Sequence, residues 1–126
     1  MKTYKIFNEL EILHNLDYEA ISVTVDKSTT GTVVENGRKI LKAGTVVAGD
    51  GKSIFEDRTK KVKKLTNAVS ATYVDGILLH DVDVTDEDVT VAIVYRGTVR
   101  EDRCENGTID ANVKAKLNHI QFVKGI

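Results

Sequence analysis

The most regular pattern of the chain lies in the stretch Asp75-Gly-Ile-Leu-Leu-His-Asp-Val-Asp-Val-Thr-Asp-Glu-Asp-Val-Thr-Val-Ala-Ile-Val-Tyr-Arg-Gly-Thr-Val99. Apolar residues open its first half and then alternate with aspartates, and apolar residues alternate again in its second half. Residues 85–88 form a polar link between the two runs. Alternation with a period of two predicts half-buried strands, and the short link predicts an antiparallel hairpin over residues 77–95.

Strand patterns recur on both sides of this stretch. In residues 20–26, Ile21, Val23 and Val25 alternate with small polar residues, which predicts a half-buried strand. Asn36-Gly37 predicts a tight turn because both residues tolerate positive φ. Ile40 and Leu41 follow this turn, and shorter strands are predicted at residues 32–35, 43–49, 72–74 and 121–123.

Two segments have less definite patterns. Residues 4–16 fit strand alternation and a helical stripe equally well, so both readings stay open. Residues 53–67 are polar and basic with a thin apolar stripe, which predicts an exposed excursion with room for one short helix.

A short amphipathic helix is predicted near residues 108–120. Thr108 is the candidate N-cap, and Asp110 lies in the first turn, where a carboxylate suits the helix dipole. Strands are not interleaved with regular helices, so the fold class is α+β and β-rich, a small antiparallel sheet or barrel-like domain. The predicted domain occupies residues 20–126, after an N-terminal segment of residues 1–19. The helix face consists of Ile109, Val113, Leu117 and Ile120.

The composition describes one small globular domain. The 126 residues are 41% hydrophobic and 29% charged, and the net charge of −1 gives no general attraction to nucleic acid or anionic membranes. The single Cys104 excludes an intramolecular disulfide and a multi-cysteine metal site. No apolar run approaches the ~20 residues of a membrane helix, and the first residues lack a signal-peptide core. We expect a soluble protein of a reducing cytoplasm.

An acidic cluster is the first candidate for chemistry. A calcium loop would need a central glycine and a terminal glutamate, and both are missing. We therefore favour a solvated polar hairpin tip over a metal site. The cluster consists of Asp81, Asp83, Asp86, Glu87 and Asp88.

The remaining reactive residues stand apart from one another. His14, His80 and His119 form no grouping with the spacing of a zinc site. Cys104 lies between Arg103 and Glu105 without a nucleophile motif. Residues 44–51 are rich in glycine but do not open a clear helix, as a phosphate loop would. We predict a non-enzymatic protein without a cofactor.

The strongest local charge is the basic run Lys60-Lys-Val-Lys-Lys64, preceded by Arg58. Nucleic-acid-binding surfaces usually add stacking aromatics, and none is interleaved here. A solvated face is favoured over contact with an acidic patch on a partner. The residues of this possible charged contact are Arg58, Lys60, Lys61, Lys63 and Lys64.

Residues 75–99 resemble the signature of tailed-phage head decoration proteins, which include lambda-type capsid-stabilising proteins and small head-fibre proteins. Residues 43–46, 76–84 and 89–99 resemble three strands of that pattern. Residues 113–123 resemble the helix-then-strand ending of the head-fibre group. The chain departs from the lambda type in its basic insertion at residues 56–67 and in its Pro-free N-terminal segment.

The resemblance implies a virion protein made in the host cytoplasm and placed on the capsid surface. It would bind the major capsid protein on the expanded head, often as a homotrimer, and brace the shell against internal pressure. Neither a membrane nor direct contact with nucleic acid is implied.

The N-terminal segment is the expected capsid-binding arm, since it could add a strand to a capsid sheet edge. Packing on the domain's own core is the equal alternative. The expected contact residues are Tyr4, Ile6, Phe7, Leu10, Ile12 and Leu13.

Two other functions compete with capsid decoration. One is another phage structural module, such as a tail-tube, head–tail connector or receptor-binding protein. The other is a small nucleic-acid-binding barrel that uses residues 60–64.

Overall fold

A computed structural model describes residues 12–13, 18–104 and 109–124. Strands account for 41% of the structure and helices for 9%, which confirms the predicted β-rich α+β class. The elements in chain order are β1 (Glu19–Val25), β2 (Val33–Glu35), β3 (Arg38–Leu41), β4 (Val46–Gly49), β5 (Val62–Lys64), β6 (Gly76–Leu78), β7 (Val82–Asp83), β8 (Val89–Arg100), the 3₁₀ turn η1 (Glu101–Arg103), α1 (Ala111–Lys116) and β9 (Ile120–Val123).

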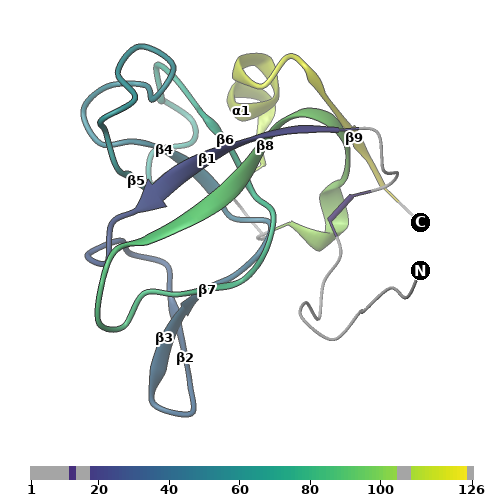
Figure 1. The fold of residues 1–126 in the computed structure, drawn as a ribbon. Helices are drawn as coiled ribbons and strands as arrows, with labels where there is room; N and C mark the ends of the chain where they lie inside the picture. Colours follow the sequence, from purple (N-terminus) through teal and green to yellow (C-terminus); the bar gives the residue numbers. More distant parts are fainter. Residues whose placement is uncertain (1–11, 14–17, 105–108, 125–126) are drawn as a thin grey trace, which may run out of the picture.

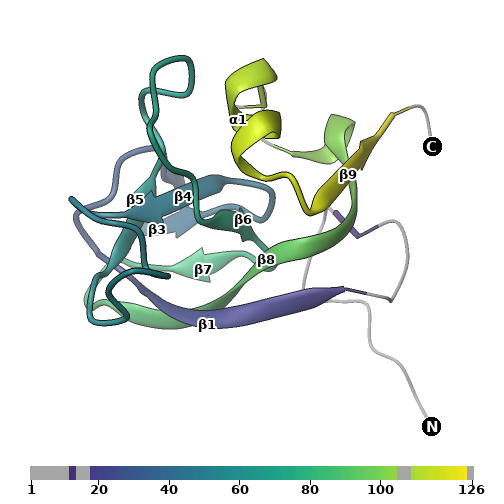
Figure 2. The same ribbon diagram turned by 90° about the horizontal axis from the view of Figure 1, so that it is seen from above.

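Five strands close into a barrel in the order β1-β5-β4-β6-β8, and β8 pairs back onto β1. The pairs are antiparallel except for β1 with β5, where Val25 lies opposite Val62. The long strand β8 extends past the barrel, where β9 adds to it in parallel beside α1 (Figures 1 and 2). Closure leaves the barrel strands without free sheet edges over their paired lengths.

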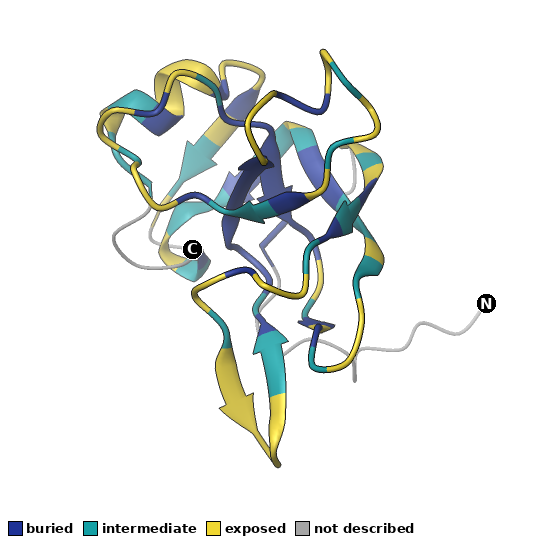
Figure 3. Ribbon diagram, turned by 90° about the vertical axis from the view of Figure 1, so that its left-hand side faces the viewer, coloured by how far each residue is buried: buried dark blue, intermediate teal, exposed yellow. Residues whose placement is uncertain are grey.

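A second, three-stranded sheet in the order β2-β3-β7 lies at one end of the barrel. Its β2–β3 hairpin projects away from the barrel body (Figures 1 and 3). The turn residues Asn36 and Gly37 have φ of 52° and 77°, so the predicted tight turn is confirmed. Both values fit a two-residue turn with positive φ at each central position.

The core has two layers because neighbouring residues of one strand point to opposite sides. Within β6, Ile77 packs into one cluster and Leu78 into the other, and Val46 and Val47 of β4 divide in the same way. One cluster includes Val25, Val62 and Ile93 inside the barrel, and the other includes Val94, Val99, Val113 and Ile120 beneath α1 and β9. Because both faces of these strands are buried, consecutive residues in them are apolar.

The hairpin predicted over residues 77–95 is confirmed in part. Strands β6 and β8 are antiparallel neighbours, with Ile77 opposite Val94. The residues between them are not one continuous arm, because β7 leaves the barrel and pairs with β3, where Val82 lies opposite Leu41. Residues 79–88 therefore join the two sheets.

The prediction that residues 53–67 form an exposed excursion was wrong. The segment contributes the barrel strand β5, and Val62 is fully buried between β1 and β4. Three residues are too few for periodicity to identify a strand. The predicted strand at residues 72–74 does not form.

The C-terminal helix is shorter than predicted, and its cap lies elsewhere. Asp110 is the N-cap, and its side chain accepts a hydrogen bond from the backbone N–H of Val113 at 3.0 Å. The candidate cap Thr108 lies outside the described residues. Ile120, expected on the helix face, begins β9 instead, and the predicted closing strand is confirmed.

Candidate functional site

The structure places two of the expected N-terminal contact residues in the core. Ile12 is fully buried and Leu13 almost so, and Leu13 forms a β-bridge with Val99. Ile12 and Leu13 therefore follow the alternative prediction, in which the segment packs on the domain's own core. The predicted domain boundary after residue 19 does not separate these two residues from that core. Tyr4, Ile6, Phe7 and Leu10 lie outside the described residues, so their contact with a capsid stays a prediction.

The basic run is part of the barrel wall and is paired along much of its length. Lys61 forms an ion pair with Asp88 at 2.5 Å, and Lys63 approaches Asp50 at 3.5 Å. Arg58 donates to the backbone carbonyl of Ser22 at 2.9 Å. The backbone N–H of Lys64 donates to Thr29, and that of Lys60 to the carbonyl of Asp57. The two ion pairs compensate the positive charges of Lys61 and Lys63.

The acidic cluster has a structural role that the sequence did not reveal. Asp83 and Asp86 pair with Arg38, Asp81 pairs with Lys42, and Asp88 pairs with Lys61. Asp81 and Asp88 also accept from backbone N–H groups, so a purely solvated interpretation is incomplete. In the part of the chain that the structure describes, no group of three histidine, cysteine or acidic side chains could hold a metal ion.

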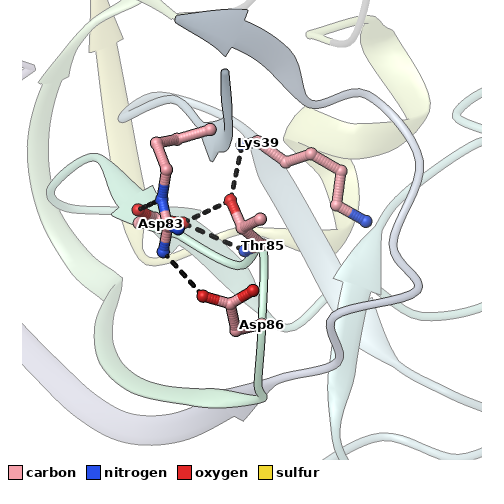
Figure 4. A network of polar contacts seen from close by, with 5 residues as sticks. Lys39, Asp83, Thr85 and Asp86 are labelled. Atoms are coloured by element: carbon pink, nitrogen blue, oxygen red, sulfur yellow. Dashed lines mark hydrogen bonds and ion pairs between the residues drawn. The ribbon is translucent and has the colours of Figure 1, made fainter. Parts of the chain in front are cut away.

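One half of this arrangement fastens β3 to the link before β8 (Figure 4). The guanidinium of Arg38 donates to Asp83 at 2.8 Å and to Asp86 at 3.0 Å. The hydroxyl of Thr85 accepts from the backbone N–H of Lys39 at 2.7 Å and donates to Asp83 at 2.7 Å. The hydrogen bond from Arg38, followed by those from Thr85, lowers the pKa of Asp83 to about 2.

The other half holds the base of the hairpin. The ammonium of Lys42 contacts Glu35 at 2.9 Å and Asp81 at 3.3 Å. Asp81 also accepts from the backbone N–H of Ala43 at 2.8 Å. The hydrogen bond to Glu35 is the main reason that the pKa of Lys42 rises to about 12. We call residues 33–41, held by these contacts, the anchored hairpin.

The anchored hairpin presents apolar side chains to solvent. All three residues of β2 are exposed, with Val33 at 43% and Val34 at 72% of their full accessibility. Figure 3 shows this strand as an exposed projection from a largely buried barrel. An exposed edge strand with apolar side chains is accessible for pairing with another chain.

Asp75 is a buried polar residue for which the sequence patterns predicted no role. Its side chain is 1% exposed and accepts hydrogen bonds from the backbone N–H of Gly49 at 2.6 Å, the hydroxyl of Ser53 at 2.5 Å and the N–H of Ile54 at 3.0 Å. The carboxylate therefore joins β4, the following loop and β6. The sequence signal for this buried role is a carboxylate that lies directly between Val74 and an apolar strand.

Two hollows lie near this carboxylate. One of about 310 Å³ is lined by polar loop residues, including Asp50, Lys63, Asn67 and Tyr73. The other, of about 260 Å³, lies between Phe55, Tyr95 and residues 116–119, with the two rings packed edge to face at 5.5 Å.

The cysteine is not activated for nucleophilic chemistry. Burial, followed by the charges of Glu101 and Asp102, raises the pKa of Cys104 to about 12. The thiol is therefore protonated at neutral pH. His14 lies outside the described residues, while His80 and His119 are exposed.

No family model matches this chain, and no curated protein and no solved structure matches it either. Within the described ranges, no helix is long and apolar enough to cross a membrane.

Proposed function

We propose that this chain is a non-enzymatic structural protein of a tailed-phage head, which binds the major capsid protein on the outer surface of the expanded shell. The resemblance of residues 75–99 to head decoration proteins suggests the setting. The geometry supports the more general part of the proposal, which is a protein that works by docking.

The observation that carries the proposal is the anchored hairpin on a closed barrel. Arg38, Thr85 and Lys42 fix its position, and Val33 and Val34 lie exposed on its outer strand. Fixing the side chains and backbone before contact lowers the entropy lost on binding. A small rigid surface suits a protein whose copies bind a repeating lattice.

Repetition compensates for a small contact area. A three-residue strand contributes far less than the roughly 800 Å² per partner of a stable interface. Copies that contact both the shell and one another convert weak contacts into strong collective binding. The expected homotrimer and the expected N-terminal arm would each add such a contact.

The alternative of a nucleic-acid-binding barrel has less support, because Lys61 and Lys63 are paired with carboxylates. A mobility-shift assay at low salt tests it directly, and binding that weakens steeply with salt would favour it. A tail-tube, connector or receptor-binding role remains the nearer alternative, since such modules also work by docking.

Co-sedimentation with purified heads tests the proposal. We expect the protein to pellet with expanded heads and to stay in solution with unexpanded ones. Val34→Lys should reduce the bound fraction, while Val69→Lys, a change at an even more exposed valine outside the hairpin, should not. Absence of binding to heads of either form would overturn the proposal.

A further inference from the structure

The outer edge of β2 carries backbone groups that point away from the sheet. Strand β2 pairs with β3, where Val34 lies opposite Lys39, and no second strand among the described residues pairs with it. The N–H of Lys39 donates to Thr85 and its carbonyl accepts from Val84, so both groups face away from β2. In an antiparallel pair, the N–H and C=O groups of two opposite residues either both point towards the partner strand or both point away from it. The N–H and C=O of Val34 therefore face outward.

The outward direction of the Val34 backbone groups determines how another strand could pair with β2. An antiparallel strand that pairs with β2 would place one residue opposite Val34 and exchange two hydrogen bonds with it. Its side chain would lie on the same face as Val34, the more exposed of the two valines. The neighbouring residues of the added strand would lie opposite Val33 and Glu35, on the other face.

The face that carries Glu35 is rich in carboxylates among the described residues. Glu35 lies opposite Arg38 on this face, and Ile40 lies opposite Asp83. The network on it contains four carboxylates, which are Glu35, Asp81, Asp83 and Asp86, against the two cations Arg38 and Lys42. Asp86 and Glu35 are the more exposed of these carboxylates, at 70% and 48% of their side chains, so they stay accessible to a further cation.

We propose that the β2 edge receives an extended segment of a partner protein in which apolar residues alternate with lysine or arginine. The apolar side chains lie beside Val34, and the basic ones lie on the face of Glu35. Backbone hydrogen bonds supply binding and the alternation supplies specificity, as in other cases of strand addition. The inference deepens the docking role proposed above and rests on it for its biological setting, but it concerns the chemistry of the partner segment alone.

A peptide titration followed by ¹⁵N–¹H NMR tests the inference without phage heads. The probe is acetyl-Thr-Val-Lys-Val-Lys-Val-Thr-amide, and the matched control replaces both lysines with glutamate. We expect shifts at the amides of residues 33–38, protection of the Val34 N–H, and affinity for the lysine peptide about tenfold higher at low salt.

Two variants separate backbone pairing from general contact. Val34→Pro removes the outward N–H but leaves the hydrogen bonds to β3, so it should abolish binding while the amides of Lys39 and Ile40 keep their native shifts. Val34→Thr keeps the backbone and the branched side chain and should retain binding.

Three results of the peptide titration would overturn the inference. They are equal affinity for both peptides, shifts centred on the hollow at Phe55 and Tyr95, and absence of binding at millimolar peptide. Concentration-dependent shifts of β2 without peptide would also overturn it by identifying a second copy as the occupant. Failure of the protein to pellet with heads would instead contradict the proposed function and leave the peptide result intact.

Discussion

Arg38 and Asp83 lie 45 residues apart in the sequence and meet at 2.8 Å, where the guanidinium fastens the projecting hairpin to the chain between the two sheets. The pair is about half exposed, so it contributes little to global stability and acts mainly on the position of the hairpin.

Replacement of this arginine should loosen the hairpin without unfolding the barrel. For Arg38→Met we expect faster amide hydrogen exchange at residues 33–41 and a change of less than about 1 kcal/mol in the free energy of unfolding. Arg96→Met is the control, since Arg96 contacts Glu19 at 3.7 Å on the barrel wall. Equal exchange in the hairpins of both variants would contradict the anchoring role.

The same contact predicts an acid limit for the anchor. The pKa of Asp83 is lowered to about 2 by Arg38 and Thr85, so its contribution is complete above the ordinary value near 4 and is lost as the pH falls through about 2. A ¹³C titration of the side-chain carboxyl should show this low midpoint. In Arg38→Met the midpoint should rise only part of the way, because Thr85 still donates. An unchanged midpoint would assign the shift to Thr85 alone.

Removal of the buried carboxylate of Asp75 should destabilise the whole domain. Asp75→Ala leaves the donors of Gly49, Ser53 and Ile54 without their acceptor, and we expect a loss of about 3 kcal/mol in urea unfolding. Asp75→Asn keeps one acceptor oxygen and should lose less. Asp50→Ala removes an exposed carboxylate and should cost less than about 1 kcal/mol. Equal losses at positions 75 and 50 would refute the linking role.

Cys104 should be unreactive in the folded protein. Its pKa of about 12 leaves almost no thiolate at pH 8, so iodoacetamide should label it at least about a hundredfold more slowly than in urea. Because the pKa in the folded protein lies above the ordinary thiol value of 9.0, the contribution of Cys104 to stability is complete below pH 9 and is lost as the pH rises towards 12. Rapid labelling of the native protein would show that this part of the core opens readily.

The strand and turn elements with strong local signals were predictable. Alternation in residues 20–26 predicted β1, and Asn36-Gly37 predicted the hairpin turn, because both patterns follow from backbone geometry. The three-residue strand β5 was missed, since Val62 alone does not make a period. Its identity depends on partners in β1 and β4 that lie far away in the sequence.

The candidate site was less predictable than the fold. The sequence directed attention to the N-terminal apolar residues and the lysine run, but Ile12 is buried and Lys61 is paired with Asp88. The hairpin was visible as a turn, and its anchoring was not. Nothing local to Arg38 indicates that its partners are Asp83 and Asp86.

The sequence by itself determined that this chain forms a small β-rich domain, and it determined the strand faces and the turn at Asn36-Gly37. These features depend on residue periodicity and on φ preferences, which act over a few residues. Only the tertiary structure decided that residues 75–99 divide between two sheets and that their aspartates hold a projecting edge. Pairing between segments that lie tens of residues apart depends on how the chain brings them together, and local sequence patterns do not contain that information.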